Sequence, residues 1–176
     1  MRLSIALAVA ASFSAACSKT PSPDPERFSL LTKEFVETSL SFSPVTATGT
    51  GYHVHQGVRL DTQLDDFSPS SLDRQRQFLQ TFRTRLEEEA KTKPDPQQSA
   101  DLSIMQDQCT LALLELDTIR NWRYNPTLYV ETIGSALFQP YLLNYEPLPK
   151  RFEHIIARLE KIPAFLETAR GSREAA

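Results

Sequence analysis

The sequence predicts an all-α fold of about six helices in an irregular, mostly antiparallel bundle. Apolar residues recur at steps of three, four and seven along most of the chain, which is the period of one helix face. Prolines, of which the chain has 12, stand where these patterns begin or break, as is usual at helix starts and ends. Connections between the patterns are short, apart from one long loop near residues 44–69, and short connections make neighbouring helices antiparallel.

The first 17 residues have the layout of a secretory signal peptide, so we exclude them from the fold. One positive charge at Arg2 precedes an apolar run over residues 3–11, and small residues then lead to Cys17. An apolar core of roughly ten residues is too short to span a bilayer as a stable helix. We therefore expect this protein to be exported.

The end of that signal resembles a bacterial lipobox, in which a cysteine is diacylated and becomes the new N-terminus. Residues 14–17 read SAAC, with Ser14 where the lipobox pattern usually has Leu. Ordinary cleavage after small residues is the alternative. Residues 18–25 are rich in proline and polar side chains, which suits an extended tether. We predict lipidation at Cys17 and a lipid-anchored protein of the periplasm or cell envelope.

The charge distribution does not favour a nucleic-acid partner. The formal net charge is −3, from 19 Lys and Arg against 22 Asp and Glu. Basic residues are interleaved with acidic ones along the chain, whereas nucleic-acid binding needs a basic stripe or patch. The only cysteine besides Cys17 is Cys109. Because it lies within an apolar helical pattern, we expect it to be a buried small hydrophobe.

The first predicted helix covers residues 26–43 and ends before Pro44, because a residue that precedes proline is biased away from helical geometry. Residues 44–69 follow as a predicted long loop, with a short extended piece around residues 52–54. This segment holds three of the five glycines and no sustained periodicity. A loop of about 25 residues is unusual in a compact domain and is commonly functional. It is our first candidate for a functional surface.

Four further helical stretches follow the loop. One begins at Ser70 or Ser71 and ends in the charged run 87–89. The longest covers residues 99–124, and its broad apolar face indicates burial from more than one side. The third covers residues 127–142, and the fourth starts at Pro149 and places four apolar residues on one side: Phe152, Ile155, Ile156 and Leu159.

A last short helix follows Pro163, so the helical part covers residues 26–170. Residues 171–176 are small and polar, and we expect a disordered tail there. We also interpret this ending as the mark of a truncated gene or a fragment.

No catalytic residue or metal ligand can be assigned in this chain. A zinc peptidase would show His-Glu-x-x-His on one helix face, and that motif is absent from the sequence. His53 and His55 lie two positions apart and would share one face of an extended segment, but no third ligand is evident nearby. His154 is expected to be an exposed helix residue.

Aromatic residues with polar tips are the other feature of interest, because they can either line a cleft or fill a corner between helices. The corner is the more usual role. Together with the loop residues, they supply the candidate cleft-lining side chains: Tyr52, His53, His55, Trp122 and Tyr129.

Several short segments, in this order and spacing, resemble the bacterial domain of unknown function 885. The resemblance covers nearly the whole chain after the tether, from Phe28 to Arg170. The segments that carry it are EF at 34–35, SPVTAT at 43–48, GYH at 51–53, LDDFS at 64–68, WRYNPTLY at 122–129 and RLEKIP at 158–163.

The resemblance implies the N-terminal part of a longer, largely helical protein. Members of that family are often exported or lipid-anchored, and many look like zinc metallopeptidases with His-Glu-x-x-His in their C-terminal half. Zinc and a peptide substrate are therefore expected only in a full-length relative. We expect this chain to be the N-terminal helical fragment of such a hydrolase, lacking the metal site and inactive alone. The alternative is a small envelope lipoprotein that acts as a non-enzymatic binding module.

Overall fold

Helices make up most of the described chain, which is residues 25–174 of a computed structural model. The predicted all-α class is confirmed. The predicted signal, the lipidation residue Cys17 and the tether up to residue 24 lie outside the described residues. The helices are α1 (Pro25–Ser41), α2 (Pro44–Thr50), α3 (Pro69–Ala90), α4 (Pro96–Leu114), α5 (Asn121–Tyr124), α6 (Pro126–Leu142), α7 (Leu148–Leu159) and α8 (Ile162–Glu174).

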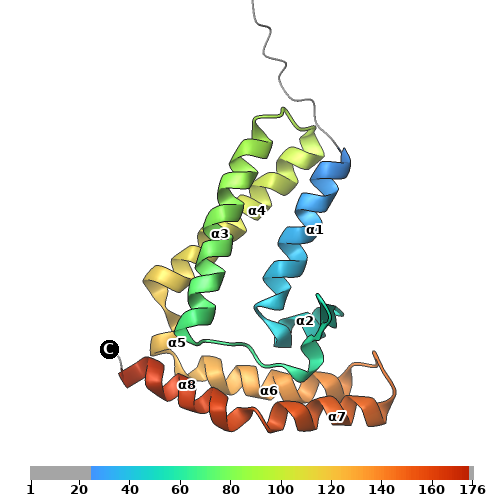
Figure 1. Ribbon diagram of the computed structural model, residues 1–176, viewed down its shortest axis with the longest axis vertical. Helices are drawn as coiled ribbons and strands as arrows, with labels where there is room; N and C mark the ends of the chain where they lie inside the picture. The colour runs from blue at the N-terminus through green and yellow to red at the C-terminus, as the bar shows by residue number, and fades with distance from the viewer. Residues whose placement is uncertain (1–24, 175–176) are drawn as a thin grey trace, which may run out of the picture.

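The helices form two groups, and one lies across the end of the other. Helices α1, α3 and α4 run side by side, and α6, α7 and α8 lie across their lower ends (Figure 1). The first group encloses a core of leucines, phenylalanines, Met105 and Cys109. Cys109 is fully buried, as predicted. Tyr129, Phe165 and Ala169 form a smaller second core between α6 and α8. Each fully buried large apolar side chain contributes about 1.5–3 kcal/mol to folding.

Prolines and capping side chains fix where the helices begin. Helix α4 starts at Pro96 instead of at Ser99 as predicted, because Asp95 and Gln98 form a reciprocal capping box. The Asp95 carboxylate accepts from the Gln98 backbone N–H at 2.9 Å, which satisfies a donor that has no partner within the helix.

The predicted single helix over residues 99–124 is wrong in its last part. The α-helix ends at Leu114, a π-helical turn (η2, Glu115–Ile119) follows, and Arg120 has a left-handed backbone with φ of 56°. Helix α5 then starts in a new direction. The Glu115 carboxylate holds this corner by accepting from the Asn121 backbone N–H at 2.9 Å and from its side chain at 3.1 Å.

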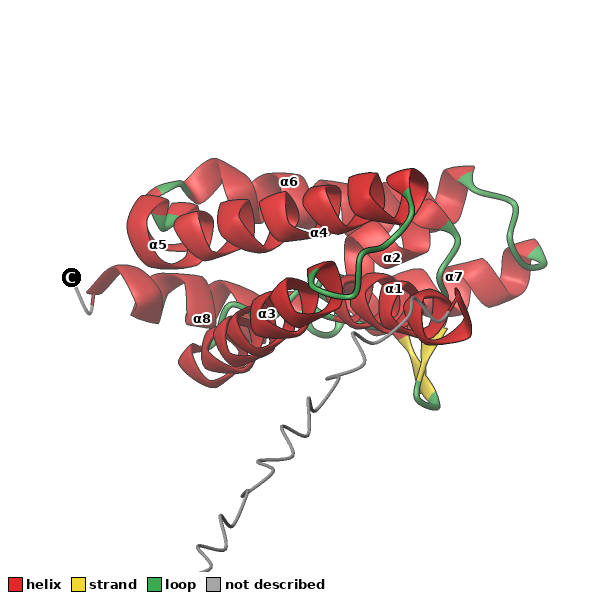
Figure 2. Ribbon diagram, turned by 90° about the horizontal axis from the view of Figure 1, so that it is seen from above, coloured by secondary structure: helices red, strands yellow, loops and turns green. Residues whose placement is uncertain are grey.

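The predicted loop over residues 44–69 is also largely structured. It holds α2, a hairpin of β1 (Val54–His55) and β2 (Val58–Arg59), and a 3-10 helix, η1 (Leu60–Thr62). The hairpin stands at the edge of the molecule (Figure 2). Helix α2 is capped from a distance, because the Asp65 carboxylate accepts from the Val45 N–H at 3.0 Å. Local sequence patterns carry no sign of such a contact.

Helix α7 is oriented against the usual rule that the apolar side of a helix faces the core. Its charged side, with Arg151, His154 and Arg158, is buried, whereas Phe152, Ile156 and Leu159 are exposed. His154, predicted to be exposed, is 5% exposed. The bonds that cause this reversal are described below.

The chain end differs as well. Helix α8 continues to Glu174, where we expected a disordered tail from Gly171. Gly171 has no positive φ and therefore extends the helix. Among the helices within residues 25–174, none is both long enough and apolar enough to cross a membrane.

Candidate functional site

The guanidinium of Arg158 lies at the centre of the contact between the two helix groups. Its side chain is 0% exposed and donates to the backbone oxygens of Gln63 at 2.9 Å and Ala136 at 2.8 Å. It also donates to Thr48 Oγ1 at 2.7 Å, with longer bonds of 3.3 Å to two further backbone oxygens. One side chain of α7 thereby joins α2, α6 and the segment around η1.

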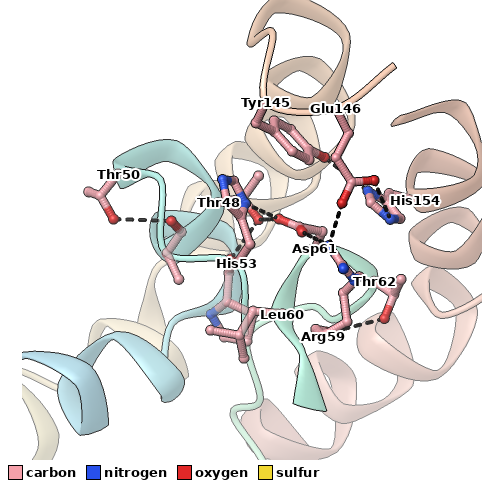
Figure 3. Close-up of polar contacts among 12 residues, drawn as sticks. Thr48, Thr50, His53, Arg59, Leu60, Asp61, Thr62, Tyr145, Glu146 and His154 are labelled. Atoms are coloured by element: carbon pink, nitrogen blue, oxygen red, sulfur yellow. Dashed lines mark hydrogen bonds and ion pairs between the residues drawn. The ribbon is translucent and has the colours of Figure 1, made fainter. Parts of the chain in front are cut away.

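Asp61 is the buried anion of this cluster, and its side chain is also fully buried. One carboxylate oxygen accepts from Thr48 Oγ1 at 2.9 Å and contacts His53 Nδ1 at 2.8 Å. The other accepts from Arg59 at 3.3 Å. A buried charge is tolerated only when it is paired and hydrogen-bonded. We call Thr48, Asp61 and Arg158 the polar hub; two of them, Thr48 and Asp61, are labelled in Figure 3.

Three rings lie beside the polar hub. The His53 ring stacks on Tyr145 with centroids 4.4 Å apart, and Tyr145 Oη lies 3.1 Å from His154 Nδ1. Burial lowers the pKa of His154, so this imidazole is neutral at pH 7. Burial, reinforced by the nearby Asp61 charge, raises the pKa of Tyr145 to about 12. The phenol therefore stays protonated and can donate to His154.

Glu146 connects the ring cluster to the hairpin. Its carboxylate accepts from Arg59 at 2.7 Å and lies 4.0 Å from His154 Nε2 (Figure 3). The side chains of Arg59 and Glu146 are 42% and 27% exposed, so this ion pair lies at the surface end of the cluster. The charged side chains become less exposed from this pair inward to Asp61 and Arg158, which are fully buried.

Two of the predicted cleft-lining residues, Tyr52 and His55, lie together beside the hairpin. Tyr52 Oη and His55 Nδ1 are 2.9 Å apart. His55 lines a surface cavity of about 390 Å³ with Gln56, Val58 and Arg74 among its other walls. Tyr52 lines a second hollow, along α1. The third loop candidate, His53, is in the ring cluster.

The remaining two candidates, Trp122 and Tyr129, lie elsewhere, in the packing between helices. Tyr129 is 4% exposed, and its hydroxyl donates to the Trp122 backbone oxygen. Its ring packs against Phe67 and Phe165, with centroids 5.3 Å away in both cases. The geometry thus supports a corner-filling role for these two residues, which is the more usual role of such aromatics.

Sequence reasoning missed the polar hub and the ring cluster. A signal was available on α7, because Arg151, His154 and Arg158 recur at steps of three and four and so share one helix face. That face was not considered, because charged residues are rarely buried. Asp61 and Tyr145 gave no local signal, since their partners are distant in sequence.

The residues present do not fit a zinc site. Within residues 25–174, no three His, Cys, Asp or Glu side chains are grouped so that they could hold a metal ion. His53 and His55 each contact another side chain through Nδ1, Asp61 and Tyr52 respectively. Zinc needs at least three protein ligands at one point, so no chemical step is assigned to a metal here.

Comparisons with known proteins point to one family. The family model described as "Bacterial protein of unknown function (DUF885)" matches residues 44–176. A solved structure described as "a putative lipoprotein of unknown function from Shewanella oneidensis" is similar in fold, with a TM-score of 0.72 and 21% identity. The similarity covers 83% of this chain but 26% of that one, so this chain spans about a quarter of its length. No curated protein matches the sequence.

Proposed function

Because the chain belongs to the bacterial family of unknown function DUF885, we propose that it is the N-terminal helical part of an exported hydrolase of that family. In this role it supports and shapes a substrate-binding surface and does not hydrolyse substrate by itself. The family assignment made from the sequence motifs is confirmed by the match over residues 44–176. The activity is the part that needs a test.

The observation that carries the proposal is the difference in length between this chain and the similar solved protein. The similarity in fold covers 83% of this chain but 26% of that protein. In a protein of that length, most of the side chains available for chemistry lie outside the part that this chain resembles. The polar hub supports the same role, because its charges are all engaged in joining helices.

The surface that we propose to face substrate lies beside the hairpin. It consists of Tyr52, His55 and the cavity of about 390 Å³ that His55 lines. The cavity has both polar and apolar walls, such as Gln63 and Leu60, which suits a segment of peptide. The polar hub supports this surface from behind, since His53 precedes the hairpin, Arg59 lies in its second strand, and both contact Asp61.

The activity is tested with the purified chain. The chain is incubated with a mixture of peptides, with zinc added and with a chelator added. We expect no peptide hydrolysis in either condition. Hydrolysis by the chain that the chelator abolishes would show that it has a metal site of its own, and would overturn the proposal. Specific binding of another envelope protein through this surface, without binding of peptide, would favour the envelope binding module.

Export and anchoring are a second part of the proposal. The lipobox-like residues 14–17 and the lipoprotein description of the similar structure support a lipid anchor at Cys17. In cells that express the full chain, we expect the protein in the membrane fraction and labelled by radioactive palmitate. The Cys17→Ser variant should be unlabelled and should leave the membrane fraction. Equal fractionation of both forms, without label, would overturn the anchor.

A further inference from the structure

Helix α7 has its polar side inward and its apolar side outward. Arg151, His154 and Arg158 are 8%, 5% and 0% exposed. Four large apolar residues, separated by four, four and three positions, form the opposite side. This side, which we call the α7 stripe, consists of Leu148, Phe152, Ile156 and Leu159, which are 44–54% exposed.

This orientation is fixed by hydrogen bonds. Arg151 donates to the backbone oxygens of Pro140, Tyr141 and Leu143, at 3.0, 2.9 and 2.8 Å. These oxygens lie at the C-terminal end of α6, where carbonyl groups lack partners within the helix. Arg158 holds the other end of α7 through the polar hub. Turning α7 to bury the stripe would break both sets of bonds, so the exposure of the stripe is built into the fold.

A continuous apolar stripe along a helix normally faces another packed element, whereas single exposed apolar residues are ordinary. Within residues 25–174, about half of the surface of each of its four residues stays exposed. In the similar solved protein, the part that this fold does not match is about three times as long as the part that it matches. We propose that the α7 stripe is the docking face for a helix from that further part of a DUF885 protein. This inference rests on the proposed function.

The position of the stripe argues against a lipid bilayer as its occupant. Helix α7 lies at the opposite end of the molecule from the start of α1, where a tether from Cys17 would arrive (Figure 1). Helix α1 has 17 residues, so at 1.5 Å per residue its first residue lies about 25 Å from its last, which is the end nearer to α7. The charged residues beside the stripe are a Lys150–Glu153 ion pair and Glu160. They do not form the basic cluster that anionic lipids attract.

The first experiment uses the full chain and two double variants. Phe152→Gln with Ile156→Gln removes half of the stripe, and Lys150→Gln with Glu153→Gln is the control on the same helix. In the isolated chain we expect both to keep the wild-type melting temperature within about 2 °C. The stripe variant should bind less of a hydrophobic dye. A large loss of melting temperature in the stripe variant alone would show that these residues are already packed, and would overturn the inference.

The second experiment places the chain where its partner is present. A chimera is made in which this chain replaces the matching quarter of the Shewanella oneidensis lipoprotein. We expect the chimera to be a folded monomer, and the stripe substitutions to lower its melting temperature by at least 5 °C more than the control pair. The same substitutions would thus be harmless in isolation and harmful in the longer protein.

The other results separate the two proposals. A chimera with the wild-type stripe that does not fold contradicts the proposed function, and with it this inference. A folded chimera that tolerates the stripe variant as well as the control contradicts the inference alone. Two further results also contradict it: a dimer of the isolated chain that the stripe substitutions abolish, or binding to anionic vesicles that they abolish.

Discussion

Arg158 carries its charge where no water reaches it, and its hydrogen bonds, together with the nearby carboxylate of Asp61, make that position tolerable. Its guanidinium donates to five oxygens contributed by α2, η1, α6 and the chain after η1, and three of these oxygens lie around one terminal nitrogen, Nη2. A buried charge of this kind gives little net stability compared with apolar packing. Removing it is nevertheless harmful, because several carbonyl groups are then left buried without a donor.

Replacing Arg158 by Met should therefore lower the free energy of unfolding by about 3–5 kcal/mol. Urea unfolding followed by circular dichroism measures this. Thr48→Val is the milder variant, because it keeps the shape but removes one hub contact, and about 1–2 kcal/mol should be lost. The control is Arg74→Ala. The Arg74 side chain is 60% exposed, so its removal should change the free energy of unfolding by less than about 0.5 kcal/mol. Equal stability of Arg158→Met and the control would contradict the stabilising role of the polar hub.

Asp65 gives a prediction that depends on pH. Burial raises its pKa from 3.8 to about 6, although the Val45 N–H and Arg158 both favour the charged form. The folded state therefore holds this proton more tightly than the unfolded state. The resulting stability is fully present below pH 3.8 and is lost as the pH rises through about 6. At 1.36 kcal/mol per pKa unit, the loss at pH 8 is at most about 3 kcal/mol.

Asp65→Asn should remove this dependence, because the amide oxygen still accepts from Val45 but carries no charge. We expect the variant to be more stable than wild type at pH 8, and this advantage to shrink between pH 6.5 and 4.5. Melting temperatures across that range measure it. Asp107→Asn removes an exposed carboxylate and is the matched control for the loss of one charge. An advantage of Asp65→Asn that stays constant with pH would rule out the raised pKa.

The hairpin shows how far local chemistry can predict an element. Gln56 and Gly57 both have positive φ, 47° and 81°, which is the type I′ turn of a two-residue hairpin. The glycine could have signalled this turn. Gln is a poor residue for its first position, and Asn-Gly is the pair that marks such turns in a sequence. The prediction of a short extended piece near residue 54 was therefore all that the local pattern supported.

Gln56→Asn should stabilise the hairpin, because Asn adopts a left-handed backbone more readily than Gln. We expect a gain of about 0.5 kcal/mol. Gly57→Ala should lose about 1 kcal/mol or more, since alanine is strained at φ of 81°. Chemical denaturation reports both changes, and amide exchange at Val54 and Val58 localises them. A stabilised Gly57→Ala variant would contradict this turn geometry.

Helix boundaries were predictable from the sequence where the signal was local, and helix orientation was not. Prolines and capping residues marked the starts of most helices within a few positions, and the apolar period marked the core of α1, α3 and α4. For α7 the same period was present, but it could not show which side of the helix is buried. The usual rule would bury the apolar side, whereas carbonyl groups at the end of α6 bind Arg151 and turn the charged side inward. Contacts between distant segments leave no trace in a single helix pattern.

The same limit explains what was found of the candidate site. The segment at residues 44–69 was the first candidate for a functional surface because of its length and glycines, and Tyr52, His53 and His55 lie in it. Its partners Tyr145, His154 and Arg158 come from the far end of the chain. They could not be connected to it without the fold. Trp122 and Tyr129 were grouped by residue type, which cannot distinguish a cleft wall from a corner between helices.

At the scale of the whole molecule, two cores must unfold together for the chain to behave as one unit. Phe67 is the aromatic residue that packs against both of them. Its ring lies 5.3 Å from Tyr129 and 6.0 Å from Phe165 in the second core. We therefore expect Phe67, more than any fully buried leucine, to couple the two helix groups.

Phe67→Ala should separate the unfolding of the two groups. In wild type, circular dichroism and the fluorescence of the single tryptophan, Trp122, should give one coincident transition. In the variant, the smaller core should melt first, so that calorimetry shows two transitions. Phe78→Ala is the control, because Phe78 packs against the first core. It should lower stability by about 2–4 kcal/mol yet keep one transition. Coincident transitions in Phe67→Ala would mean that the polar hub alone is sufficient to couple the groups.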